Sequence, residues 1–139
     1  TIHSSRRRFA ARLNSSVRPV EKHLAKLVGK CAREEHVGAS DIDELCTFSG
    51  LDRPLIYDSI AAYIANEFAS DRLSFEDADA VANFLWAESS FGLSGFAKDV
   101  FLAFDDGEQL ATSEPTGTDP VAKYTRPQIA DLLARRPQV

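Results

Sequence analysis

The chain lacks most of the residues from which catalytic and cofactor sites are commonly built. Its 139 residues include no Met, one Trp, two Cys and three His, and every His lies within the first 36 positions. No G-x-S-x-G nucleophile motif occurs, and the seven glycines never form a G-x-G-x-x-G or G-x-x-x-x-G-K phosphate loop. These absences favour a protein without a cofactor and without a catalytic site, although they leave enzymatic activity open.

Long apolar runs are also missing. No stretch approaches the roughly 20 apolar residues that a membrane-spanning helix needs, so we expect no membrane partner. Two cysteines are too few for a disulfide framework. Cys31 and Cys46 lie among apolar neighbours at helical spacing, which favours buried free thiols and a reducing, cytoplasmic compartment.

Charge is plentiful and is sorted by position. The first 33 residues contain nine Lys or Arg and one acid, whereas residues 34–114 contain eighteen Asp or Glu and three bases. Such asymmetry predicts either a charged partner or two regions of one protein that attract each other. We expect residues 1–16 to be a basic flexible arm, or the remnant of a transit peptide, and residues 17–139 to be a single helical domain.

Apolar residues recur at helical spacing along the domain, and no alternating strand pattern of useful length is present. The clearest helix begins at Asp52 with Pro54 in its first turn, and its apolar face carries Leu55, Ile56, Ile60, Tyr63, Ile64 and Phe68. The pattern predicts an all-α fold, a compact bundle of five to six short-to-medium helices. A homodimer is an open alternative, because this face and the phenylalanines from Phe75 to Phe104 are many for one small core.

Helix boundaries are predicted from capping residues. Gly38 is expected to end the first helix and Ser40 to cap the second. Ser74, followed three residues later by an acid, resembles a capping box. Thr125 followed by Pro127 predicts the start of the last helix.

An acidic turn, DDGE at residues 105–108, follows the fifth predicted helix. It does not match an EF-hand loop, because the twelfth position counted from Asp105 is Thr116 and not Glu. Acids at a helix C-terminus oppose the helix dipole. We therefore expect a cationic side chain to hold them there, either Arg126 or the Arg cluster at residues 6–8.

A metal site is the first chemical alternative. Cys31, His36 and Cys46 combine soft ligands within sixteen residues, with acids nearby. Their C-x4-H-x9-C spacing matches no close-paired zinc pattern, and a structural site needs a fourth ligand. Two buried thiols and a surface histidine account for the same residues, and we favour that interpretation.

The C-terminal third resembles a pattern in a family of small bacterial proteins. The pattern comprises VFLAFDDGE at residues 100–108, then a loop, then DPVAKYTRPQIADLL at residues 119–133. The similarity covers roughly residues 73–135, and it departs from the pattern at Gln109, where an aromatic residue often follows the acidic turn. The resemblance implies a bacterial source and a compact helical domain, and it brings no activity with it.

Two residues of the second segment flank the predicted helix start at Thr125. We expect Tyr124 to pack against the first turn of the helix as a staple. We expect Arg126 to reach the acids of the preceding turn.

The leading hypothesis is a non-catalytic, acidic protein-binding domain that neutralises or regulates a basic protein partner. The candidate partner-binding residues are Arg6, Arg7, Arg8, Asp105, Asp106, Glu108, Tyr124 and Arg126. The first alternative is binding of nucleic acid through residues 6–12, which combine four Arg with one Phe. The second alternative is a small metal-dependent enzyme that uses the cysteines and His36.

Overall fold

The computed structural model describes residues 20–109 and 114–136, so the expected arm at residues 1–16 lies outside the described residues. Within them the fold is all-α and contains no strand, which confirms the predicted fold class. A first helix covers residues 20–32. The elements that follow are α2 (Ala39–Ser49), α3 (Arg53–Ala69), α4 (Phe75–Glu88), α5 (Gly95–Asp105), the π-helical turn η1 (Val121–Thr125) and α6 (Arg126–Arg135).

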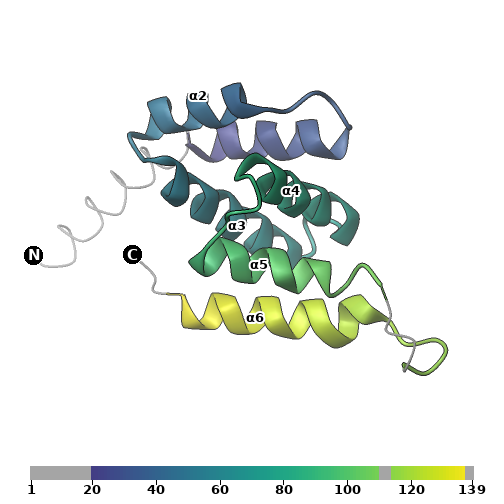
Figure 1. The fold of residues 1–139 in the computed structure, drawn as a ribbon. Coiled ribbons are helices and arrows are strands. Elements are labelled where there is room, and N and C mark those ends of the chain that lie inside the picture. The colour runs from purple at the N-terminus through teal and green to yellow at the C-terminus, as the bar shows by residue number, and fades with distance from the viewer. Residues whose placement is uncertain (1–19, 110–113, 137–139) are drawn as a thin grey trace, which may run out of the picture.

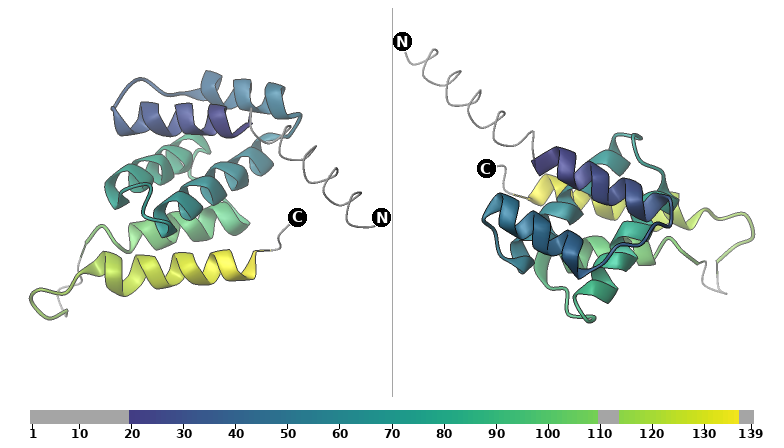
Figure 2. Two further views of the ribbon diagram at one scale, coloured as in Figure 1. Left: turned by 180° about the vertical axis from the view of Figure 1, so that it is seen from behind. Right: turned by 90° about the horizontal axis from the view of Figure 1, so that it is seen from above.

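The helices are arranged around α3, which contacts α2, α4, α5 and α6. The first helix and α2 lie side by side at one face of the molecule, α5 and α6 lie at the opposite face, and α3 and α4 lie between (Figures 1 and 2). The first and last described residues, Val20 and Arg136, are at one end of this stack. The turn after α5 and the loop beyond it are at the other end.

Most of the predicted apolar face of α3 is buried inside the monomer, but Leu55 is 50% exposed. Ile56, Ile60 and Ile64 have no exposed surface. Phe68 meets Phe104 of α5 edge-on, with the ring centroids 5.2 Å apart. Burial of a phenylalanine of this kind stabilises a fold by about 3–5 kcal/mol relative to alanine. The monomer therefore covers most of this face, and the homodimer stays an open alternative.

Several predicted helix ends are confirmed. Asp52 is the N-cap of α3, and Pro54 lies in its first turn. Ser74 caps α4, where its hydroxyl oxygen accepts the Asp77 N–H at 3.2 Å. Such caps stabilise a helix by about 1 kcal/mol.

Two boundaries near the start of the domain were predicted wrongly. The first helix ends at residue 32, and Glu34 turns the chain with a φ of 56°. Gly38 is the N-cap of α2, which begins one residue before Ser40. The Asp41 carboxylate supports this start, because it accepts the Gly38 N–H at 3.0 Å, which is the half of a capping box that a glycine N-cap allows.

The predicted start of the last helix is confirmed, because Thr125 is the N-cap of α6 and Pro127 lies in its first turn, but further helical turns precede it. These turns start at Val121, five residues before α6, and Thr125 ends the π-helical turn η1. Pro127 has no N–H to donate to an earlier carbonyl, so the regular α-helical ladder cannot run through it. The wider π turn accommodates this position. An Asp119 carboxylate oxygen accepts the Val121 N–H at 3.0 Å and fixes the start of the turn.

Candidate functional site

The acidic turn and the start of the last helix meet at one end of the molecule. Asp105 is the last residue of α5 and Asp106 is its C-cap. These two acids, Glu108, Gln109 and Tyr124 line a hollow of about 490 Å³. Four of the eight residues predicted to bind a partner are therefore neighbours around one concavity, which we call the acidic hollow.

The hollow is held together by a close contact that sequence reasoning missed. Gly107 is buried, and a Cβ atom at this position would lie 2.2 Å from the Thr125 hydroxyl oxygen and 2.9 Å from Cε2 of Phe75. That hydroxyl is fully buried and donates to the Ala103 carbonyl oxygen at 2.7 Å. Glycine is needed here because no side chain fits between the turn and the helix that covers it.

No described cation pairs with the acids of the hollow. None of the ion pairs among the described residues involves Asp105, Asp106 or Glu108. Neutral amides bind two of them instead. Gln128 Nε2 donates to Asp106 Oδ2 at 3.0 Å, and Asn83 Nδ2 donates to Glu108 Oε2 at 3.4 Å.

Asp79 of α4 extends the acidic group, and nothing in the sequence pattern pointed to it. Its Oδ2 accepts the Asn83 amide at 3.3 Å, whereas its Oδ1 is buried without a hydrogen-bond partner among the described residues. Burial, then the charge of Glu108, raises the pKa of Asp79 to about 7. Burial and the charges of Glu108 and Asp106 also raise the pKa of Asp105. Burial and neighbouring carboxylates therefore disfavour the ionised forms of Asp79 and Asp105.

The prediction that Arg126 reaches these acids is wrong. Its guanidinium lies over the Phe68 ring, 4.4 Å from the centroid, and donates to Asp71 at 3.0 Å. This position lets the side chain cover the aromatic core while it keeps its charge in water. The Arg cluster at residues 6–8, the other predicted partner of the acids, lies outside the described residues.

Tyr124 closes one side of the hollow. Its hydroxyl donates to the Glu114 carboxylate, which also pairs with Lys123. The loop residue Glu114 is thereby tied to η1, and Lys123, one of the bases nearest the hollow in sequence, is already engaged. The ring of Tyr124 contributes a wall that is aromatic and half-buried.

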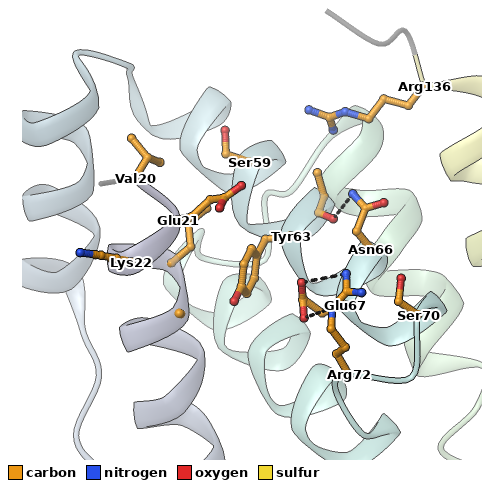
Figure 3. Close-up of a pocket in the computed structure, with 13 residues that line it drawn as sticks. Val20, Glu21, Lys22, Ser59, Tyr63, Asn66, Glu67, Ser70, Arg72 and Arg136 are labelled. Atoms are coloured by element: carbon orange, nitrogen blue, oxygen red, sulfur yellow. Dashed lines mark hydrogen bonds and ion pairs between the residues drawn. The ribbon is translucent and has the colours of Figure 1, made fainter. Parts of the chain in front are cut away.

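A second concavity, a groove of about 790 Å³, lies between the first helix and α3 (Figure 3). Tyr63 points into it from α3, and burial together with the charges of Glu67 and Glu21 raises its pKa. Glu67 is paired with Arg72 at 2.9 Å, and Arg136 stands at one end of the groove. Its charges are mixed and partly compensated, so the groove selects no class of ligand.

The metal hypothesis gains no support from the geometry. Over residues 20–109 and 114–136, no three His, Cys, Asp or Glu side chains are placed to hold a metal ion, and this includes Cys31, His36 and Cys46. Both cysteines are free and half-buried. Burial, helped by the charge of Asp41, raises the pKa of Cys31 to about 11, so this thiol stays protonated at neutral pH.

No helix in the described part of the chain is both long and apolar enough to cross a membrane. Comparisons of the chain with protein-family models, with curated proteins and with solved structures give no match. The resemblance of residues 73–135 to a bacterial family therefore stays a prediction.

Proposed function

We propose that this chain is a non-catalytic protein-binding domain that holds a basic segment of a partner protein in the acidic hollow and so neutralises or regulates that partner. The observation that carries the proposal is the set of three carboxylates, Asp105, Asp106 and Glu108, around one concavity without a described cation. The free half-buried thiols fit a cytoplasmic setting for this function.

Electrostatics supports a cationic occupant. The carboxylates stand at the C-terminus of α5, where the helix dipole is negative, so each costs a few tenths of a kcal/mol. An Arg or Lys side chain placed between them removes this repulsion and forms charge-assisted hydrogen bonds. A partner of opposite charge is also steered to such a surface and associates faster.

The apolar part of the site supports a peptide rather than a bare ion. The Tyr124 ring lies beside the carboxylates in the same hollow, and it already attracts one cation, the Lys123 ammonium 5.3 Å from its centroid. The loop at residues 114–120 extends from this end of the molecule (Figure 1).

The test uses two variants of equal charge. One is the triple variant Asp105→Asn/Asp106→Asn/Glu108→Gln. The matched control neutralises three exposed acids elsewhere that form no described ion pair, Glu34→Gln/Glu76→Gln/Asp99→Asn. Partners are captured from source cells at low and high salt, identified, purified and titrated against each variant by calorimetry.

We expect a basic protein whose affinity falls on the order of tenfold with the triple variant and less than twofold with the control. Equal losses in both variants would show non-specific charge attraction and overturn the proposal. Binding to a generic oligonucleotide that needs residues 1–13 and is indifferent to the triple variant would overturn it in favour of nucleic acid.

A further inference from the structure

Two carboxyl groups from different elements meet at the edge of the acidic hollow. Asp79 of α4 and Glu108 of the turn after α5 are near enough for one side-chain amide to bind both. The Asn83 side-chain amide donates to both, at 3.3 Å to Asp79 Oδ2 and at 3.4 Å to Glu108 Oε2. A direct hydrogen bond between two carboxyl groups exists only while one of them carries a proton.

The second oxygen of Asp79 makes the charged form costly. Asp79 Oδ1 is buried and accepts no hydrogen bond from the described residues. A buried carboxylate oxygen without a donor or a cation strongly favours the protonated acid.

Among the described residues, the groups that shift the pKa of Asp79 by their charge are both acidic, Glu108 and Asp105. The helix that carries Asp79 contributes Asn83, and the end of α5 contributes Asp105 and Asp106 beside Glu108. The elements that cover this end bear the neutral Tyr124 and Gln128 and two bases that are paired elsewhere, Lys123 with Glu114 and Arg126 with Asp71.

We propose that Asp79 and Glu108 share one proton beside the Asn83 amide, that this proton latches the turn after α5 to α4, and that a basic partner entering the acidic hollow drives the proton off. The last step rests on the proposed function, whereas the latch does not. The pKa of Asp79, raised to about 7, places the loss of this proton within the range of cellular pH. On release, the proton passes to water or buffer and the two carboxylates repel each other.

Coupling between the proton and the partner has a definite sign. A cationic segment stabilises the ionised pair, so binding lowers the pKa of the pair and releases protons. By the same linkage, affinity for the partner rises as the pH rises through about 7. Acidification of the medium therefore weakens binding without any change in the hollow's covalent structure.

The latch is tested on the full chain without a partner. Side-chain carboxyl ¹³C resonances are followed by NMR between pH 3 and 9, together with the side-chain amide of Asn83. We expect the Asp79–Glu108 pair to lose one proton near pH 7, with the Asn83 amide reporting the same midpoint. Asp79→Asn should abolish this step, whereas Asp77→Asn, a charge change on the same helix, should leave it. If both carboxyls titrate near pH 4, the latch is overturned.

The coupling is tested with hexa-arginine as the basic probe. We expect its affinity for the wild-type chain to rise roughly fivefold from pH 6 to pH 8, and to rise less than twofold for Asp79→Asn. Calorimetry in two buffers of different ionisation enthalpy should show proton release only with the wild type. A latch seen by NMR together with pH-independent binding overturns the coupling alone. A normal titration together with tight binding leaves the proposed function standing and removes the inference.

Discussion

Two acidic groups in this chain show how differently like charges can be placed. The acids at the start of α2 meet bases from neighbouring elements, Asp41 with Lys30, Asp43 with Arg53 and Glu44 with His23. The acids at the end of α5 meet only neutral amides within the described residues. Asp41 of the first group also lies in the first turn of α2, at the favourable end of the helix dipole, whereas the second group lies at the unfavourable end of α5.

This difference explains part of the uneven distribution of charge along the sequence. Part of the basic first quarter is used internally, because Lys30 joins the first helix to α2 through Asp41 at 2.8 Å. The acidic hollow has no such counterpart among residues 20–109 and 114–136. Charge that is compensated stabilises the fold, and charge that is left over at a concave end is available to a partner.

The largest expected effect comes from Gly107→Ala, which tests what holds the uncompensated acids in place. The new Cβ would lie 2.2 Å from the Thr125 hydroxyl oxygen, so we expect the free energy of unfolding to fall by about 2–3 kcal/mol in urea denaturation. In a Thr125→Ala background the same change should cost clearly less. Equal costs in both backgrounds would show that the Gly107–Thr125 contact is not responsible.

The next effect contrasts one acid from each group. Asp41→Ala removes the acceptor for the Gly38 N–H and the partner of Lys30, so we expect a loss of about 1–2 kcal/mol. Asp106→Ala removes an exposed hydrogen bond at an unfavourable helix end, and we expect no loss beyond a few tenths of a kcal/mol. Chemical denaturation of the two variants side by side measures the contrast, and similar losses would contradict it.

Both acidic groups should affect how the free energy of unfolding depends on pH, and the effects of Asp41 and Asp79 should have opposite signs. The pKa of Asp41 is lowered by Lys30, so its contribution is present above the unfolded value of 3.8 and is lost as the pH falls below it. The pKa of Asp79 is raised to about 7, so the native state holds an extra proton between pH 3.8 and 7, and stability falls as the pH rises through that interval.

Asp79→Asn isolates the second effect. After allowance for solvent screening we expect the variant to be about 1 kcal/mol more stable than the wild type at pH 8. At pH 4 the two should be nearly equal. Urea denaturation at the two pH values measures both differences, and a gain of the same size at pH 4 would assign it to packing instead of ionisation.

The smallest effects should be equal in size and opposite in sign. Asp105→Asn at the end of α5 should raise the free energy of unfolding by a few tenths of a kcal/mol, and Glu76→Gln in the first turn of α4 should lower it by a similar amount. Thermal unfolding at low salt resolves the pair, and 1 M salt should bring the two variants together. A shared sign would show that the helix dipole does not govern these positions.

Sequence reasoning succeeded where the cause is local. The spacing of Ile56, Ile60 and Ile64 predicted α3 because a 3.6-residue period places them on one face, and all three are fully buried. Ser74 was identified as a cap because its hydroxyl acts only three residues away, on Asp77. The sequence also predicted four of the residues around the acidic hollow, because the DDGE turn and Tyr124 stand out by composition.

Sequence reasoning failed where the partner lies far along the chain. Arg126 was expected to bind the nearest acids, but its guanidinium lies over the Phe68 ring and pairs with Asp71, 55 residues away. The start of η1 was missed because a wide turn ahead of Pro127 leaves no periodic trace.

The sequence by itself determined the helical class, the central apolar helix and the presence of unusual acids after α5, because each follows from periodicity, capping chemistry or charge within a few residues. Only the tertiary structure decided which of those acids remain uncompensated. Asp79 and Glu108 are 29 positions apart and share Asn83 because α4 and α5 pack together. Packing places these two carboxyl groups close together in a partly buried position. Burial there disfavours ionisation of both groups and so favours binding of a proton.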